Sequence, residues 1–216
     1  MKVKGTSVVF GNRFEDEFNM LSKSIGNTFE YKKYTPDVFT FNEKLNALRS
    51  IVKESCIYIL LDTDHSVVGN LETSFNCTIE EGIHTRGSLK EHSVVGWKKI
   101  NRDININGYI DILKEVAGNY WTGYLDESLL VFNITNLELF NRFLDDWQEL
   151  TELTKNNSPY RYSDQNLGAL EGCLINIAAN KNNIPIHSGK IPSVFDCFYH
   201  YGPSYGHKTK VNKSIL

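Results

Sequence analysis

The stretch Ile57-Tyr58-Ile59-Leu60-Leu61-Asp62-Thr63-Asp64 decides the fold of this chain. Its first five residues are apolar on both faces, which is typical of a central parallel strand. Two aspartates follow at i and i+2, positions that project to the same side of an extended backbone. Because open α/β sheets bind ligands beyond the carboxyl ends of their strands, Asp62 and Asp64 are candidates for one shared site.

The residues before this strand alternate between strand and helix patterns. Strands are predicted at 6–10 and 29–34, each closed by turn residues. A helix is predicted at 14–25, and the spacing of Thr40 and Glu43 indicates a capping box at the start of another. Strand, helix, strand, helix and strand in about 60 residues predict an open α/β sheet.

The second half of the chain is less regular. Residues 128–132 are predicted to form a further strand, and the spacing of Thr135 and Glu138 indicates a second capping box before a helix. Another helix is expected to start near Ser163, with its apolar face formed by Leu167, Leu170, Leu174 and Ile177. Residues 76–108 are expected to be loops with one short strand near 93–97. No linker is evident, so residues 1–216 are predicted to form one domain.

Composition narrows the class of protein. The chain has 216 residues, a formal charge of −3 and 41% hydrophobic residues, which excludes a disordered chain and argues against a general nucleic-acid binder. No window resembles a membrane span, and the apolar run near the start is too brief for a signal peptide. We therefore expect a soluble, cytoplasmic protein, in the host cytoplasm if the source is viral. The four cysteines are far apart in sequence, and we expect buried, reduced thiols.

Two carboxylates on one side of a strand end are hard oxygen ligands, which favour Mg²⁺ or Mn²⁺ bound together with substrate phosphates. The alternative is a polar turn after a strand, and Asp-x-Asp by itself favours that interpretation. The buried strand before the pair and Val67-Val68-Gly69-Asn70-Leu71 after it favour a metal site.

Residues 57–71 resemble the Asp-x-Asp segment of GT-A glycosyltransferases. They are most similar to the retaining, nucleotide-sugar-dependent group that includes glycogenin and bacterial lipopolysaccharide galactosyltransferases. Three later blocks resemble that group in the same order: 120–123 before 129–133, 162–167, and 198–203. The resemblance implies a single-domain, Rossmann-like open mixed sheet flanked by helices.

The resemblance also implies roles for individual residues. The metal, Mn²⁺ or Mg²⁺, would be bound by Asp62, Asp64 and a histidine, which is His200 or His207 because the late block departs from the family pattern. Asp164 and Gln165 would contact the donor sugar from a helix start. Apart from the resemblance, Asp126 and Glu127 are candidates for a general base if the reaction inverts configuration. The donor contacts would be Val9, Phe10, Gly11, Asn12, Lys44, Arg49, Asp62, Thr63 and Lys208.

The implied activity is transfer of a sugar from a nucleoside diphosphate, expected to be UDP, to a hydroxyl acceptor with retention. The acceptor stays open between a glycan and, for a phage source, a hydroxymethylated DNA base. The basic segment 201–216 is either a flexible tail or a closure over the donor. The alternatives are a non-catalytic sugar-nucleotide binder and, less well supported, a haloacid-dehalogenase-like phosphatase, whose Gly-Asp dipeptide this sequence lacks.

Overall fold

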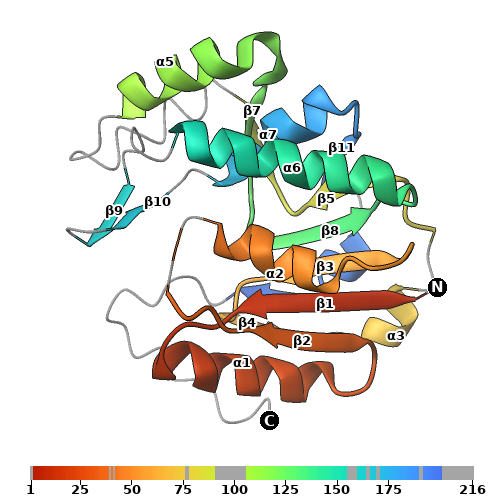
Figure 1. Ribbon diagram of the computed structural model, residues 1–216. Helices are drawn as coiled ribbons and strands as arrows, with labels where there is room; N and C mark the ends of the chain where they lie inside the picture. Colours follow the sequence, from red (N-terminus) through yellow and green to blue (C-terminus); the bar gives the residue numbers. More distant parts are fainter. Residues whose placement is uncertain are drawn as a thin grey trace.

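The computed structural model describes residues 2–38, 40, 42–75, 78–90, 106–154, 160–163, 166–168, 171–189 and 192–200. These residues form a mixed sheet with helices on both faces (Figure 1). Its six strands lie in the order β11 (Ile186–Ser188), β5 (Gly82–Thr85), β8 (Leu129–Asn133), β3 (Ile57–Leu61), β1 (Val3–Val8) and β2 (Glu30–Tyr34).

The central strand β3 is parallel to one neighbour and antiparallel to the other. It pairs in parallel with β1, which is itself parallel to β2, and antiparallel with β8. Strand β8 is also antiparallel to β5, and β5 is parallel to the edge strand β11. The prediction of an open mixed sheet is therefore confirmed, while the expectation of a purely parallel environment for β3 holds on one side only.

Alternate side chains of β3 enter two separate cores, because successive residues of a strand face opposite sides of the sheet. Tyr58 and Leu60 pack in a core with helices α2 (Glu43–Ile51), α5 (Ile106–Ala117), α6 (Leu137–Thr154) and α7 (Glu171–Lys181). Ile57, Ile59 and Leu61 pack in the other core with α1 (Asn12–Ile25), α3 (Leu71–Ser74) and α8 (Pro192–Phe195). Each such buried side chain contributes about 1.5–3 kcal/mol, so both cores hold β3 in place.

Several short strands pair outside the central sheet. Strand β4 (His65–Val67) pairs antiparallel with β12 (Phe198–His200), and β6 (Ser88–Lys90) pairs with β7 (Gly123–Leu125). A 3₁₀ turn, η1 (Gly118–Tyr120), precedes β7. The pairing of β4 with β12 brings the end of the described chain back to the residues that follow Asp64.

One of the two predicted capping boxes is present. Oε1 of Glu43 accepts hydrogen bonds from the backbone N–H of Thr40, at 2.9 Å, and from its hydroxyl. The box predicted at Thr135 is wrong, because its hydroxyl donates to Oε1 of Glu81 at 3.0 Å. Instead, Oδ1 of Asn136 accepts from the backbone N–H of Leu139 at 3.0 Å and caps α6.

The helix predicted to start near Ser163 exists, but its predicted start is wrong. Strands β9 (Tyr160–Ser163) and β10 (Asn166–Gly168) form an antiparallel pair there, and α7 begins at Glu171. The apolar periodicity predicted too early a start for this helix, because the spacing of apolar residues alone does not reveal strand pairing. Leu174 and Ile177 are buried on α7 as expected.

The loop expected over 76–108 contains strands β5 and β6. Strand β5 was missed because its buried residues include the polar His84 and Thr85. Their polar atoms are paired locally: Nε2 of His84 lies 2.8 Å from the carbonyl oxygen of Glu80, and the Thr85 hydroxyl donates to the carbonyl of Gly87 at 2.8 Å. The short strand expected near 93–97 lies outside the described residues.

Cys56, Cys173 and Cys197 are buried free thiols, as predicted, and Cys77 lies outside the described residues. Within the described part of the chain, no helix combines the length and the apolar character that crossing a membrane requires.

Candidate functional site

The carboxyl ends of β1 and β3 lie at the same edge of the sheet. The two strands are parallel, with Thr6 opposite Leu60, so the segments 9–12 and 62–64 leave the sheet together. The backbone N–H of Asp62 donates to the carbonyl of Ser128 at 2.9 Å, and the Ser7 hydroxyl donates to the carbonyl of Leu61 at 2.5 Å. The start of the Asp-x-Asp segment is therefore fixed from both neighbouring strands.

Asp62 forms an ion pair with Lys44 of α2. The ammonium nitrogen of Lys44 lies 2.9 Å from Oδ1 of Asp62 and 3.4 Å from Oε2 of Glu171, and it donates to the carbonyl of Glu127 at 3.4 Å. Burial raises the pKa of Asp62, although the nearby Lys44 charge opposes this. Burial disfavours the charge on Lys44, but the carboxylates of Asp62, Glu171 and Glu127 outweigh it and hold the pKa of Lys44 well above its ordinary value.

Two further carboxyl groups complete this cluster. Burial raises the pKa of Glu171 to about 7, and it also raises the pKa of Glu127, whose Oε2 accepts the hydroxyl hydrogen of Tyr124. Helix α7 can bring Glu171 this close because Gly172 has no side chain: a Cβ there would lie 2.1 Å from the carbonyl oxygen of Leu125. Glu171 could not be predicted as a site residue from the apolar spacing, which indicates a helix start near Ser163 and not at Glu171.

Asp64 lies in a second cluster, with His65 and His200. Nε2 of His200 is 3.2 Å from Oδ2 of Asp64, although the two residues are 136 positions apart. The rings of His65 and His200 stack with centroids 4.5 Å apart and an interplanar angle of 6°. Strand pairing explains this arrangement, since His65 of β4 is directly opposite His200 of β12.

In this second cluster, Asp64 and His200 each favour the charged form of the other. Burial opposes ionisation of Asp64, but its hydrogen bond with His200 and the charge of that ring lower the pKa of Asp64. The same hydrogen bond raises the pKa of His200. Burial and the neighbouring His200 lower the pKa of His65 to about 4, which leaves its imidazole neutral at pH 7.

One candidate ligand atom from each of Asp64, His65 and His200 lies within 4.8 Å of the other two. A carboxylate and two imidazoles are groups that can bind a divalent metal ion. His65 was missed by the sequence analysis, although it follows the Asp-x-Asp pair directly and histidine is a common metal ligand. Asp62, predicted as a ligand, contacts Lys44 instead, and its role as a ligand stays a prediction.

The other predicted site residues in the described chain differ in burial and in their hydrogen-bond partners. Val9 is buried and donates its N–H to the carbonyl of Tyr34 at 2.8 Å, and Phe10 is exposed. Gly11, at φ +87°, and Asn12 lie at the start of α1. The Thr63 hydroxyl donates to Oε2 of Glu17 at 2.9 Å.

Asp126 and Arg49 have structural partners. Oδ1 of Asp126 accepts hydrogen bonds from the Ser128 backbone N–H at 3.1 Å and from its hydroxyl at 2.7 Å. Arg49, in the last turn of α2, pairs with Asp145 of α6 at 2.6 Å, whereas Lys44, in the first turn, reaches Asp62. Their predicted roles as base and donor contact stay predictions.

Asp164, Gln165, His207 and Lys208 lie outside the described residues. The described residues on either side, Ser163 and Asn166, belong to strands β9 and β10 and not to the helix that the sequence predicts from this region. His200, the candidate histidine within the described residues, lies beside Asp64.

Gly69, in the segment after β4, is required by a close approach of the chain. A Cβ at this position would lie 2.6 Å from Sγ and 3.1 Å from Cα of Cys197. The backbone N–H of the preceding residue, Val68, donates a hydrogen bond to the carbonyl oxygen of Cys197 at 2.8 Å. The glycine of the family-like segment therefore allows the chain before β12 to pack against the segment after β4.

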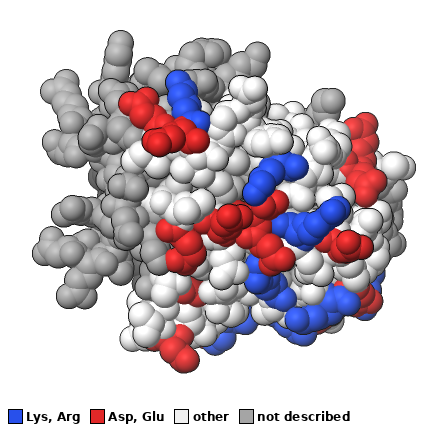
Figure 2. Space-filling model, turned by 45° about the horizontal axis from the view of Figure 1, so that its top comes forward, with Lys and Arg blue, Asp and Glu red and all other residues white. Residues whose placement is uncertain are grey.

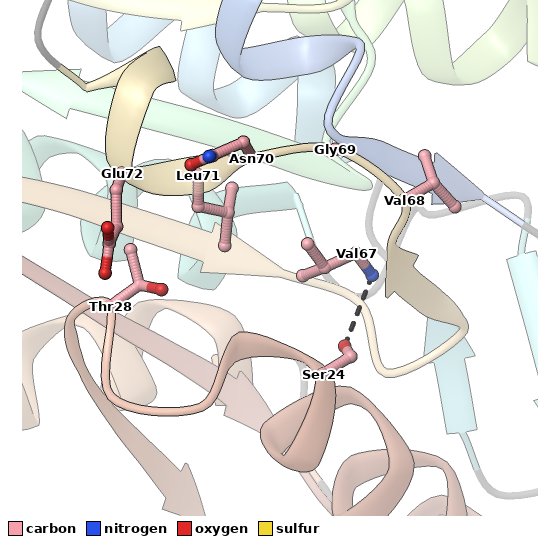
Figure 3. Close-up of a pocket in the computed structure, with 8 residues that line it drawn as sticks. All are labelled: Ser24, Thr28, Val67, Val68, Gly69, Asn70, Leu71 and Glu72. Carbon is pink, nitrogen blue, oxygen red and sulfur yellow. Dashed lines mark hydrogen bonds between the residues drawn. The ribbon is translucent and has the colours of Figure 1, made fainter. Parts of the chain in front are cut away.

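An open cavity of about 510 Å³ lies beside this segment (Figure 3). Its lining consists of the end of α1 and the loop after it, with Ser24 and Thr28, and the residues from Val67 to Glu72. The Val67 N–H donates to the Ser24 hydroxyl across it at 3.2 Å. None of the predicted site residues within the described ranges lines this cavity, and neither Asp62 nor Asp64 is part of its lining.

Comparison with solved structures finds a similar fold in a glycosyltransferase. The chain matches the apo structure of the bifunctional glycosyltransferase WbbM with a TM-score of 0.51 and 10% identity, over 94% of this chain and 46% of that one. It thus spans less than half of the WbbM chain. A match to mouse xyloside xylosyltransferase 1 in its apo form has a TM-score of 0.47 and 11% identity, over 94% and 98% of the two chains, and adds nothing to the assignment.

No protein-family model matches the chain, and no curated protein sequence matches it. The similarity to WbbM is thus one of fold, and it agrees with the GT-A resemblance found in the sequence.

Proposed function

We propose that this protein is a metal-dependent glycosyltransferase that moves a sugar from a nucleoside-diphosphate donor, expected to be UDP-linked, to a hydroxyl acceptor with retention. One observation carries the proposal. The fold shared with a glycosyltransferase brings His200 within 3.2 Å of Asp64, the second aspartate of an Asp-x-Asp pair at the carboxyl end of a central strand.

The residues present fit a divalent ion. Oδ1 of Asp64 and Nε2 of His65 are both buried and lack a hydrogen-bond partner within the described ranges, and a bound cation would satisfy the carboxylate oxygen. The proposed ligands are Asp62, Asp64 and His200. The ion, Mn²⁺ or Mg²⁺, would neutralise the charge that develops on the diphosphate as it leaves.

The chain's own residues would bind and orient the donor. Segment 9–12 and Thr63 lie at the edge where the proposed donor site is, and the N-terminus of α1 provides backbone N–H groups there. Lys44 holds Asp62 in one orientation through the ion pair. Gln165, Asp164 and Lys208 are proposed to contact the sugar and the diphosphate, and Asp126 to serve as the base if the reaction inverts.

The acceptor is proposed to be a glycan or, if the source is a phage, a hydroxymethylated DNA base. Figure 2 shows one face of the molecule on which Lys and Arg side chains lie next to Asp and Glu side chains, without a continuous basic surface among the residues described on that face. A DNA-binding enzyme would need such a surface near the site.

The proposal is tested by thermal unfolding of the full chain with UDP, GDP, CDP and their sugars, each with and without Mn²⁺. We expect UDP or a UDP-sugar to raise the melting temperature only when Mn²⁺ is present, because only the folded chain binds the complex. Asp64→Asn should abolish this shift and leave the melting temperature without ligand nearly unchanged.

A turnover assay then separates an enzyme from a non-catalytic binder. Release of UDP from a UDP-sugar, with an oligosaccharide or with water as acceptor, should require Mn²⁺ and should be lost in Asp64→Asn. Stabilisation by the nucleotide sugar without any UDP release would favour the binder, and no shift with any nucleotide would contradict the proposal.

A further inference from the structure

His65 is a buried histidine with one ring nitrogen that has no hydrogen-bond partner among the described residues, a pattern that His84 of β5 shares. Its side chain is fully buried, at 0% exposure. Nδ1 lies 3.0 Å from the carbonyl oxygen of Asp62, which can only accept, so Nδ1 carries the hydrogen. Nε2 then has a free lone pair, and no described residue donates a hydrogen bond to it. A buried acceptor without a donor costs free energy unless something binds to it.

Metal-bound histidines commonly have this arrangement. One ring nitrogen donates to a backbone carbonyl, which fixes the tautomer and the ring orientation, and the other nitrogen coordinates the ion. In this chain the carbonyl belongs to Asp62 and therefore to the same Asp-x-Asp segment. His65 is thus held ready to coordinate by the backbone of the site itself.

Its neighbours supply the remaining donor atoms. Oδ1 of Asp64 is 3.6 Å from Nδ1 of His65 and is buried without a hydrogen-bond partner in the described chain. His200 stacks on His65 and lies 3.2 Å from Oδ2 of Asp64. One candidate donor atom from each of the three residues fits within 4.8 Å.

We propose that His65 is an additional ligand of the divalent ion, beside the proposed ligands Asp62, Asp64 and His200, and that the two imidazoles in this set select a transition-metal ion over Mg²⁺. The inference rests on the metal dependence in the proposed function. Imidazole nitrogen suits Mn²⁺, Co²⁺ and Zn²⁺, whereas Mg²⁺ prefers oxygen ligands and retains its water.

The first test uses the unmodified chain and needs no variant. The metal-free full chain is loaded with one equivalent of Mn²⁺, and pulsed electron paramagnetic resonance counts the directly bound nitrogens. Two histidine nitrogens are expected. Calorimetric titration should also show Mn²⁺ or Co²⁺ binding at least tenfold more tightly than Mg²⁺.

The second test compares His65→Gln with His84→Gln. His84 is a matched control, because it is also buried and also stacks on another histidine, His187, with centroids 4.5 Å apart. His65→Gln should lose one nitrogen coupling and at least tenfold in Co²⁺ affinity, while His84→Gln should retain both. Circular dichroism in metal-free buffer checks that each variant is folded.

The outcomes separate this inference from the proposed function. One bound nitrogen in the unmodified chain, or Co²⁺ affinity within twofold of it in His65→Gln while Asp64→Asn loses binding, would overturn the role of His65 and leave the metal site standing. If the unmodified chain binds none of these ions, both the role of His65 and the metal dependence are wrong.

Discussion

The ammonium group of Lys44 lies 2.9 Å from Oδ1 of Asp62, so the first aspartate of the Asp-x-Asp pair is neutralised by a cation of the chain itself. The second aspartate, Asp64, contacts His200 instead. The two carboxylates are two positions apart, yet their nearest charged partners come from different elements of the fold. Asp62 is tied to helices α2 and α7, and Asp64 to strands β4 and β12.

Replacing Lys44 by methionine should destabilise the fold. The variant keeps the length of the side chain but leaves Asp62 and Glu171 without their shared cation. We expect the free energy of unfolding to fall by about 2 kcal/mol, less than the ~3–5 kcal/mol for a fully buried pair, because Asp62 is 35% exposed. Urea unfolding at pH 7 measures the change.

Lys33→Met provides the control, since Lys33 pairs with Glu15 at 2.6 Å with both side chains 40% exposed. An exposed pair of this kind contributes less than ~1 kcal/mol. Equal losses of unfolding free energy in the two lysine variants would show that the ion pairs of Lys44 stabilise the fold no more than an exposed pair does.

Stability should depend on pH through Glu171. Its pKa in the folded chain is raised from 4.5 to about 7 by burial, so between these values the folded chain binds more protons there than the unfolded chain. The free energy of unfolding therefore falls as pH rises through this window. Glu171→Gln removes that contribution, and its stability should improve relative to the unmodified chain by about 1–3 kcal/mol between pH 4.5 and 8.

Urea unfolding of metal-free protein at several pH values measures this difference. Asp62 and Glu127, whose pKa values are also raised by burial, contribute with the same sign in both proteins, so only the difference between the curves reports on Glu171. Parallel curves would mean that Glu171 is not protonated in the folded chain near neutral pH.

Gly172→Ala should destabilise the protein, although this change in a helix usually stabilises by ~0.5–1 kcal/mol. The added Cβ would lie 2.1 Å from the carbonyl oxygen of Leu125 and 2.9 Å from Oε2 of Glu127. Helix α7 would have to move away, at a cost of about 1–3 kcal/mol. Thermal and urea unfolding measure the sign directly.

A Cβ at Gly87 would meet nothing within 4 Å, so Gly87→Ala is the matched control and should change stability by less than ~0.5 kcal/mol. Stabilisation by Gly172→Ala would contradict the close packing of α7 against the segment before β8.

Gly69→Ala tests the contact between the segment after β4 and Cys197. The added Cβ would lie 2.6 Å from Sγ, so we expect a loss of about 1–3 kcal/mol in the free energy of unfolding. Cys197→Ala removes that sulfur and should recover part of the loss in the double variant. A double-mutant cycle with a coupling of at least ~0.5 kcal/mol is the expected result, and strictly additive losses would show that the two residues do not meet.

Sequence reasoning predicted the elements whose signals are local. The run from Ile57 to Leu61 is apolar on both faces, and it forms the central strand. The capping box of Thr40 and Glu43 forms as predicted. These predictions succeed because periodicity and capping depend on residues within one or two turns of each other. The same reasoning failed at β5, because the buried polar residues His84 and Thr85 interrupt the apolar pattern that predicts a buried strand.

The sequence by itself therefore determined a buried strand ending in two aspartates on one side, since the backbone geometry of a strand settles that arrangement. Only the tertiary structure decided which partners the aspartates meet. The pairing of β4 with β12 places His65 opposite His200, and the packing of Gly172 against Leu125 brings Glu171 to Lys44. Those contacts depend on the combined packing free energy of segments far apart in the chain, which no local pattern contains.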